Sequence, residues 1–597
     1  MKKKLIIDNL NYMFKKWYEW NKKSYFYCII SVISSVIITT MYAIILKVII
    51  NNIEKSETIE NFIKAILILS LVLIISILLN IYSNKKLTFV ADIARLKYRS
   101  IALDKLMNTD YINIESIEGR VQFEKGKDFA FMGRWSGSQD FYQIITQIFT
   151  CILGFFSYLI LLIYLNPIVV LLLLVTCVCE FFIVRKLSLM EIENRNYIVP
   201  IYQKIDYLFR TAISPTGIKD IKLYNAENWF KEMINKLTAD CNAFLKNLTK
   251  TVFSVNFART IIFFLRELLA LIILLIQVFY YDLSMSNFVF YFGIITGFSS
   301  WIITIAQQLN NLERACYQCN EYRKFIDLKD EKANNILKEK ILDPKLIEFI
   351  DVSFDYRNIN ILNNINFSIK KGEKIAIVGE NGAGKTTLIK ILCGLYKPTK
   401  GKILINGVDV TEINQKEYFK MFSVIFQDHF FLPDSIMNNI TMKAKIDEIE
   451  EKRVIDILNQ IGLIDKIKQT PNFLDTKMIS EINKDAIEFS GGEEQSILLA
   501  RCLYKNSPII ILDEPASALD PIAEDRLYNN YNDLMNDKTI IYISHRISST
   551  KFCDKIIFLK KGKIVENGTF KELMNNKSYY WNMYKMQSFY YVNEGDC

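Results

Sequence analysis

The chain has 597 residues, 51% of them hydrophobic and 23% charged, and its 73 Lys and Arg against 64 Asp and Glu give a formal net charge of +9. This length leaves room for several folding units, and so apolar a composition excludes intrinsic disorder. Eleven scattered cysteines argue against a secreted disulfide framework, and two histidines exclude any mechanism that needs a histidine cluster.

Apolar runs too long for ordinary core helices fill the first half of the sequence. About 20 apolar residues cross the hydrocarbon core of a bilayer as a helix. The run at 141–179 is about twice that length, and Asn166-Pro167 near its middle predicts a turn that divides it. Six transmembrane helices are therefore expected. The runs occupy residues 24–46, 65–84, 141–179, 260–281 and 283–312.

The charges that flank these runs predict the orientation. Residues 1–23 hold seven lysines, whereas the short connections at 51–60, 166–167 and 282–287 hold only Lys55. The positive-inside rule then places the N-terminus in the cytoplasm. A cleaved signal peptide is the alternative for the first run, but that run is too long and lacks a small-x-small cleavage site, which favours a retained span.

The two connections on the inner side, 85–140 and 186–255, are charged but carry apolar residues at three- and four-residue spacing. We interpret them as cytoplasmic extensions of the spanning helices. Separate loop domains are the alternative, but neither connection has the clusters of turn residues that such domains need.

The pattern changes at about residue 343. Short β-branched runs then alternate with helical stretches, as at 374–378, 509–512 and 539–543, which predicts an α/β domain with a largely parallel sheet. The segment 327–343, rich in Lys, Glu and Asn, is the expected linker.

A glycine-rich loop follows the first of these strands. Gly379-Glu380-Asn381-Gly382-Ala383-Gly384-Lys385-Thr386 matches the P-loop pattern G-x-x-x-x-G-K-[ST]. In such a loop the backbone N–H groups converge on phosphate oxygens, Lys385 reaches the β and γ phosphates, and the Thr386 hydroxyl binds Mg²⁺. A glycine turn with a chance Lys and Thr is the alternative, but the strand before the loop and the helix after it argue for a nucleotide site.

A second strand, Ile509 to Leu512, ends in two acids, Asp513 and Glu514. Asp513 would hold the Mg²⁺ water shell, and Glu514 could polarise the water that attacks the γ-phosphate. A solvated strand end is the alternative, which the P-loop upstream makes less attractive.

These residues resemble the nucleotide-binding domain of ATP-binding cassette (ABC) proteins, over nearly all of residues 345 to 585. The deciding segment is Phe489-Ser490-Gly491-Gly492-Glu493, the counterpart of the family signature LSGGQ just upstream of the two acids. In the family this segment caps the γ-phosphate bound to a partner domain, and the resemblance gives that role to Ser490, Gly491 and Gly492.

The resemblance extends to other short segments in the family order. It implies that Tyr356 stacks on adenine, that Gln427 is the lid glutamine that touches Mg²⁺, and that Ser517 to Asp520 form the D-loop. It also implies that His545 contacts the γ-phosphate. The expected catalytic residues are Glu514, His545 and Gln427, and the expected metal-binding residues are Thr386, Gln427 and Asp513. The expected nucleotide-binding residues are Tyr356, Gly379, Glu380, Asn381, Gly382, Ala383, Gly384, Lys385, Thr386, Thr387, Ser490, Gly491, Gly492 and Asp520.

Three positions depart from the family pattern. Glu493 replaces the signature Gln, Phe489 replaces its Leu, and Ser496 stands where a basic residue usually follows. A carboxylate near triphosphate would repel it, more strongly if desolvated. The departures therefore bear on ATP affinity and rate, whereas Glu514 and His545 are intact.

Six spans followed by one nucleotide-binding domain resemble a half-size ABC exporter. The family binds each ATP between two domains, and since one chain carries every motif, a homodimer is the simplest assembly, with a heterodimer as the alternative. Residues 217–227 resemble the segment that leads from the second coupling helix of exporters, and 111–118 lie where the first is expected. A solvated amphipathic helix is the alternative for both.

Arg266 and Glu267 lie inside the fifth span. Charges within a membrane are costly and usually face protein or water, so these two residues are the first candidates for the cargo cavity. A structural interhelical ion pair is the equal alternative. Gln143, Gln147 and Gln277 are weaker candidates.

The sequence thus predicts a multidomain membrane protein with an all-α transmembrane domain of six long helices (1–326), a linker (327–343) and an α/β P-loop nucleotide-binding domain (344–590). We expect a multi-pass cell-membrane protein of bacterial composition, with a cytoplasmic nucleotide-binding domain. Its expected cofactors are ATP and Mg²⁺, and its expected partners are a second copy, the lipid bilayer and a cargo, not nucleic acid.

The resemblance implies an ATPase that exports a peptide or hydrophobic compound by alternating access. A lipid or drug flippase of the same architecture and an ATP-gated regulator or channel are the alternatives, and an importer sharing the exporter fold is a third. The intact Glu514 favours turnover over a pure switch. Peptide cargo is preferred because small bacterial exporters provide the likeness.

Overall fold

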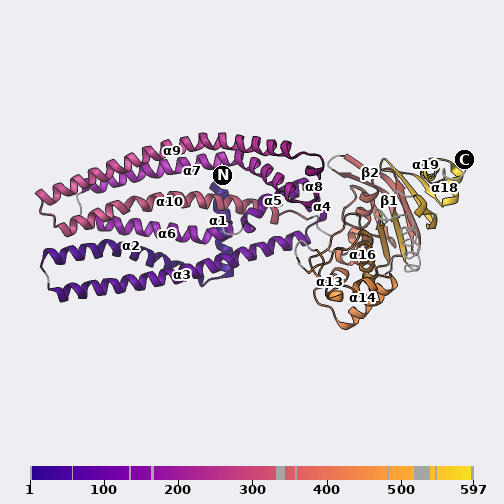
Figure 1. Cartoon of the computed structure of the whole chain (residues 1–597), viewed down its shortest axis with the longest axis horizontal. Helices are drawn as coiled ribbons and strands as arrows, with labels where there is room; N and C mark the ends of the chain where they lie inside the picture. Colours follow the sequence, from indigo (N-terminus) through magenta and orange to yellow (C-terminus); the bar gives the residue numbers. More distant parts are fainter. Residues whose placement is uncertain are drawn as a thin grey trace. The chain divides into compact units, whose positions relative to one another are not determined.

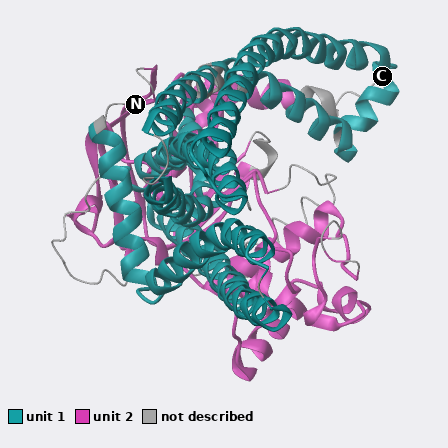
Figure 2. Ribbon diagram, turned by 90° about the vertical axis from the view of Figure 1, so that its left-hand side faces the viewer, with its two compact units in different colours: residues 1–109, 113–329 teal, residues 110–112, 330–597 magenta. Residues whose placement is uncertain are grey.

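Long helices fill the first unit of the chain, and the strands lie in the second (Figure 1). The computed structural model describes residues 3–56, 58–132, 136–162, 167–330, 343–356, 359–479, 483, 485–515, 538–544 and 547–592. The first unit comprises residues 1–109 and 113–329, and the second comprises 110–112 and 330–597 (Figure 2).

Within the described residues, six helices are long and apolar enough to cross a membrane, which confirms the predicted number. They are α2 (Ser24–Glu54), α3 (Ile59–Asn108), α6 (Gly137–Leu162), α7 (Pro167–Ile213), α9 (Glu227–Tyr280) and α10 (Met285–Ile326). Large apolar side chains such as Leu67 and Leu78 of α3 are more than half exposed, as expected of surface that faces lipid. The chain is a multi-pass membrane protein.

Most of these helices extend beyond the uncharged runs that predicted them. α2 continues through Lys47 to Glu54, and α3 continues to Asn108, because a helix persists through charged residues once its apolar part is fixed. The division of the run at 141–179 falls between α6 and α7, which begins at Pro167, a residue suited to the first helical turn. Asn166 lies outside the described residues.

The two inner connections are helical, as their periodicity predicts. Four shorter helices join or flank the long ones: α1 (Lys3–Trp20), α4 (Tyr111–Glu115), α5 (Ile117–Ala130) and α8 (Pro215–Leu223). The Ser214 side chain caps α8 by accepting a hydrogen bond from the backbone N–H of Gly217. A Cβ at Gly217 would lie 2.1 Å from the Thr211 carbonyl oxygen, so this turn needs a glycine.

Two sheets and a helical part build the second unit. Its strands are β1 (Leu346–Tyr356), β2 (Ile359–Lys370), β3 (Lys374–Gly379), β4 (Lys400–Ile405), β5 (Val408–Asp409), β6 (Phe422–Ile425), β7 (Ile509–Asp513), β8 (Thr539–Ile543), β9 (Lys555–Lys560) and β10 (Lys563–Gly568). Its helices are α11 (Lys385–Leu392), α12 (Gln415–Lys420), α13 (Ile436–Thr441), α14 (Glu448–Gln460), α15 (Ile464–Lys468), α16 (Gly491–Lys505), α18 (Phe570–Asn576) and α19 (Tyr579–Val592).

The larger sheet has the strand order β10-β9-β3-β8-β7-β6 and is parallel apart from β10. Every residue of β7 and of β8 is buried, as expected of parallel strands covered on both faces. The smaller sheet, β2-β1-β4-β5, is antiparallel. The predicted α/β domain is therefore confirmed, with an antiparallel sheet that the sequence analysis did not foresee.

Candidate nucleotide-binding site

The carboxyl ends of four neighbouring parallel strands, β3, β8, β7 and β6, meet at one edge of the larger sheet. The P-loop follows β3, Asp513 ends β7 and Glu514 comes directly after it, and Gln427 comes two residues after β6. Segments far apart in the sequence are thereby brought to one crevice, where open α/β sheets bind their ligands.

The P-loop backbone depends on glycine at two positions. Gly379 has φ of +153°, and a Cβ there would lie 2.1 Å from the Leu559 carbonyl oxygen. Gly384, the residue before α11, has φ of +101°, and a Cβ there would lie 2.8 Å from the Leu362 side chain. The loop therefore turns sharply from β3 into α11, whose N-terminal N–H groups and dipole favour an anion.

Lys385 lies inside the turn that the P-loop makes. Its ammonium donates hydrogen bonds to the carbonyl oxygens of Gly379 (2.9 Å) and Glu380 (3.0 Å), and the residue is only 6% exposed. Burial lowers the pKa of this ammonium, whereas the charges of Glu514 and Asp513 raise it. A cation is thus held beneath the loop where phosphate oxygens would approach.

Thr386 and Asp513 join the P-loop to the end of β7. The Thr386 hydroxyl donates a hydrogen bond of 3.4 Å to the Asp513 carboxylate, which is 3% exposed. Burial, and then the neighbouring Glu514, raise the pKa of Asp513 to about 6. A bound cation would lower the pKa of Asp513 and so offset the effects of burial and of the Glu514 charge. These two oxygen donors suit Mg²⁺, which commonly binds one or two protein oxygens together with substrate phosphates and water.

Glu514 has a backbone conformation unusual for its residue type. Its φ is +53°, and its N–H donates a hydrogen bond of 3.0 Å to the Ile543 carbonyl oxygen of β8. A non-glycine residue in the left-handed region costs on the order of 1 kcal/mol, and such residues cluster at functional sites. The turn ends β7 abruptly and leaves this carboxylate partly exposed at the sheet edge.

Gln427 and Tyr356 are both accessible to a ligand. Gln427 is exposed, and its backbone carbonyl oxygen lies 3.3 Å from the His429 ring nitrogen Nδ1. The Tyr356 ring is half-buried at the end of β1, with its centroid 6.5 Å from that of Tyr396.

The signature segment begins α16 with a reciprocal cap. The Ser490 hydroxyl accepts from the backbone N–H of Glu493 (3.4 Å), and the Glu493 carboxylate accepts from the backbone N–H of Ser490 (2.9 Å). Lys466 lies 3.4 Å from the same carboxylate. The backbone hydrogen bond from Ser490, aided by Lys466, lowers the pKa of Glu493. The carboxylate that replaces the signature Gln is therefore engaged in capping the helix.

Sequence reasoning missed this role of Glu493, although the spacing Ser-x-x-Glu before an apolar run is the pattern of a capping box. The structure also shows the surroundings of the other two departures. Phe489 is buried in an apolar cluster with residues of α13 and α14, and the Ser496 hydroxyl donates to the Gly492 carbonyl oxygen at 3.1 Å. His545, Asp520 and the rest of the 517–520 segment lie outside the described residues.

Comparison with known proteins shows the family of the chain. A family model described as ABC transporter matches residues 362–517, which include the P-loop, the signature segment and both acids. Over 457 residues the chain is 30% identical to the subtilin transport ATP-binding protein SpaT of Bacillus subtilis, and the match covers 75% of this chain and 74% of that protein. The chain belongs to the ABC transporter family.

Other relatives carry transport names as well. The transporter is 29% identical over 383 residues to the nisin transport ATP-binding protein NisT of Lactococcus lactis subsp. lactis, covering 62% of this chain and 63% of that protein. It is 36% identical over 243 residues to an ATP-dependent lipid A-core flippase of Methylobacillus flagellatus, covering 40% and 41%.

The transporter has the fold of a half-size ABC exporter, with six apolar helices followed by one ATP-binding domain. A solved structure of a bacterial Atm1-family ABC exporter with ATP bound matches it with a TM-score of 0.76 at 19% identity. That match covers 96% of this chain and 99% of the other.

The transporter's membrane helices also contain a buried charge cluster. Arg266 of α9 is 1% exposed, lies 3.6 Å from a Glu180 carboxylate oxygen on α7 and donates a hydrogen bond to the adjacent Glu267. Its guanidinium also lies over the Phe263 ring. Sequence reasoning missed Glu180, which directly follows the uncharged run at 141–179. The contact between Arg266 and Glu180 is an interhelical ion pair, and a role of Arg266 and Glu267 in the cargo cavity stays a prediction.

Proposed function

We propose that this transporter hydrolyses ATP to move a peptide out of the cytoplasm by alternating access. The observation that carries the proposal is the sheet edge at which Lys385, the Thr386–Asp513 pair and Glu514 converge. A phosphate-binding cation, a metal-binding pair and a second carboxylate are the groups that phosphoryl transfer to water requires.

Each residue has a role in the proposed reaction. Lys385 and the P-loop N–H groups bind and orient the β and γ phosphates. Glu514 accepts the proton of the attacking water as the general base. Thr386 and Asp513 would hold Mg²⁺, with Gln427 completing the ligands, and the ion would neutralise charge that develops on the phosphate oxygens. His545 would contact the γ-phosphate.

The reaction needs a second copy of the chain in this proposal. Ser490, Gly491 and Gly492 begin α16 and would cap the γ-phosphate bound to the partner, so two copies make two equivalent sites. α4 and α8 would be the coupling helices, with the nucleotide-binding domain in the cytoplasm as the charge of residues 1–23 predicts.

Peptide cargo is favoured by the extent of the matches. The SpaT match covers 457 residues, far more than the nucleotide-binding domain contains, so it must include membrane helices. The flippase match covers 243 residues, a length that the nucleotide-binding domain alone can supply. Lipid export is the second candidate because the same architecture serves in a flippase.

The test is the variant Glu514→Gln in purified transporter. Because the change removes the base but keeps shape and hydrogen bonding, we expect hydrolysis to fall at least about a hundredfold while ATP still binds and closed dimers accumulate. Glu448→Gln, on the exposed surface of α14, is the control and should hydrolyse ATP as the wild type does.

Three results would overturn the proposal. Hydrolysis above about a tenth of wild type in Glu514→Gln would show that this carboxylate is not the base. ATP-dependent uptake of lipid but of no peptide into inside-out vesicles would replace peptide export by the flippase function, and hydrolysis without uptake would favour a regulator or channel.

A further inference from the structure

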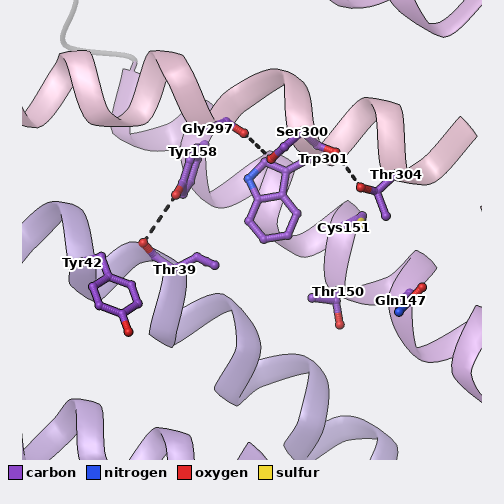
Figure 3. Close-up of a pocket in the computed structure, with 10 residues that line it drawn as sticks. All are labelled: Thr39, Tyr42, Gln147, Thr150, Cys151, Tyr158, Gly297, Ser300, Trp301 and Thr304. Atoms are coloured by element: carbon purple, nitrogen blue, oxygen red, sulfur yellow. Dashed lines mark hydrogen bonds between the residues drawn. The ribbon is translucent and has the colours of Figure 1, made fainter. Parts of the chain in front are cut away.

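A cavity of about 480 Å³ lies among α2, α6 and α10 in the membrane unit (Figure 3). Its size is that of a pocket for a small ligand or for a few residues of a peptide. Three helices that are separate in the sequence contribute to its wall. The lining residues are Thr39, Tyr42, Gln147, Thr150, Cys151, Tyr158, Gly297, Ser300, Trp301 and Thr304.

Two glycines fix the aromatic wall of the pocket. A Cβ at Gly154 of α6 would lie 2.7 Å from the Trp301 ring of α10, and a Cβ at Gly297 of α10 would lie 2.9 Å from the Tyr158 ring of α6. The two rings stand edge to face with centroids 5.8 Å apart, and the Tyr158 hydroxyl donates to the Thr39 carbonyl oxygen at 3.4 Å. Each helix thus makes room for an aromatic ring of the other.

The hydroxyl oxygens of the pocket can accept further hydrogen bonds. Four of them donate to carbonyl oxygens of their own helices, which uses their only proton and leaves the hydroxyl oxygens as acceptors. They belong to Thr39 (2.9 Å to Val36), Thr150 (2.9 Å to Thr146), Ser300 (2.6 Å to Gly297) and Thr304 (2.8 Å to Ser300). A ligand with N–H or O–H groups could donate to these oxygens.

The pocket also offers donors. The indole of Trp301 lies amid the lining residues in Figure 3, and its Nε1–H is buried without a hydrogen-bond partner among the described residues. Burying a donor unpaired costs free energy, which a ligand carbonyl would recover. Gln147, a weaker candidate from the sequence, is exposed on the pocket wall and can both donate and accept.

None of the ten lining residues carries a charge. A phosphate or carboxylate group would therefore lose hydration there without gaining a cation. Arg266, a buried cation of the same membrane unit, already pairs with Glu180 and Glu267. The lining accordingly favours a neutral ligand over the anionic head group of a phospholipid.

We infer that this pocket is a cargo subsite for an uncharged, amide-bearing segment of a peptide. Peptide carbonyl groups accept from Trp301 and Gln147, peptide N–H groups donate to the threonine and serine oxygens, and apolar side chains rest on the aromatic wall. The inference deepens the proposed function and rests on it, since it assigns the cargo contact to these neutral residues.

The probe for this subsite is a short N-acetylated, C-amidated peptide of Ala, Leu, Ser and Gln with one benzophenone side chain. The full-length transporter in phosphatidylcholine nanodiscs is photolabelled with it and the labelled segments are read by mass spectrometry. We expect labels on α2, α6 and α10, and about tenfold weaker binding in Trp301→Phe, which keeps an aromatic ring but removes the donor. Trp229→Phe, 65% exposed on α9, is the matched control and should bind as the wild type does.

Competition separates the possible occupants. The unlabelled neutral peptide should displace the probe at least about tenfold better than the same peptide with two Asp residues. Displacement by phosphatidylglycerol as effective as that by the neutral peptide would assign the pocket to lipid and overturn the inference. If Trp301→Phe does not fold, Gln147→Leu takes its place with the same expected direction.

The failures of the two proposals are distinguishable. Wild-type transporter that transports and captures peptide, but equally well with Trp301→Phe and Gln147→Leu, would overturn the subsite alone. Wild-type transporter that neither captures nor transports any peptide would overturn peptide export and the subsite together.

Discussion

Asp513 in the second unit and Arg266 in the first are almost equally buried, at 3% and 1% exposure. They differ in whether the neighbouring charges have the same sign or the opposite sign. Asp513 has a second carboxylate, Glu514, beside it, and this like charge adds to burial in raising its pKa. Arg266 lies between two carboxylates of α7 and α9. The comparison teaches that like charges held together point to a cationic ligand, whereas opposite charges held together point to helix packing.

The largest expected effect tests the role of Arg266 in helix packing. Removing the guanidinium in Arg266→Ala leaves the buried Glu180 and the partly buried Glu267 without a cation, so we expect about 3–5 kcal/mol of destabilisation. The melting temperature and the yield of solubilised transporter should fall together. Adding Glu180→Gln to Arg266→Ala should restore part of the loss, because one of the two stranded charges is then removed.

Arg210→Ala is the matched control for this variant. Arg210 pairs with Asp206 on α7, but both side chains are more than half exposed, so the change should cost less than about 1 kcal/mol. A stable Arg266→Ala dimer that lost its cargo-stimulated hydrolysis would instead make Arg266 a cargo contact, as the sequence allowed.

Asp513→Asn tests the other half of the comparison, the pair of like charges at the end of β7. The folded-state pKa of about 6 lies above the ordinary value of 3.8, so the folded protein binds more protons between these values and loses stability as the pH rises through them. Above pH 6 the ionised carboxylate therefore costs stability. We expect Asp513→Asn to raise the stability of the nucleotide-free protein at pH 7.5 by about 1–3 kcal/mol.

The measurement is thermal unfolding at pH 4 and pH 7.5, with and without Mg²⁺ and ATP. The stabilising effect should vanish at pH 4, and Mg²⁺ with ATP should stabilise the wild type more than the variant. Lower stability of Asp513→Asn at pH 7.5 without nucleotide would contradict this account of the raised pKa.

The smallest expected effect concerns Glu493. Glu493→Ala removes half of the capping box and should destabilise the protein by about 0.5–1 kcal/mol, whereas Glu493→Gln keeps a side-chain acceptor at that position. Hydrolysis by Glu493→Gln should stay within about twofold of wild type, since the carboxylate is already engaged by Ser490 and Lys466. A rise of more than about tenfold in ATP affinity would show that the charge acts on the nucleotide.

The sequence was most informative where function depends on contiguous residues. The P-loop and the acids at 513–514 are local patterns with strands beside them, and the apolar runs predicted six helices because a bilayer sets their minimum length. Contacts between distant segments were not predictable in the same way. Nothing in the sequence pairs Glu180 with Arg266, or Gly154 with Trp301, because each contact depends on how two helices are rotated against each other.

α9 runs for 54 residues, from Glu227 to Tyr280, and is therefore about 80 Å long. A rod of this length is a lever: tilting one end by about 5° displaces the other by about 7 Å. The short helix α8 connects the C-terminal end of α7 to the N-terminal end of α9 (Figure 1). A movement of α8 is therefore passed to both long helices. A small displacement of α8 is therefore amplified along α9, and the bending stiffness of α9 determines how much of that displacement reaches its far end.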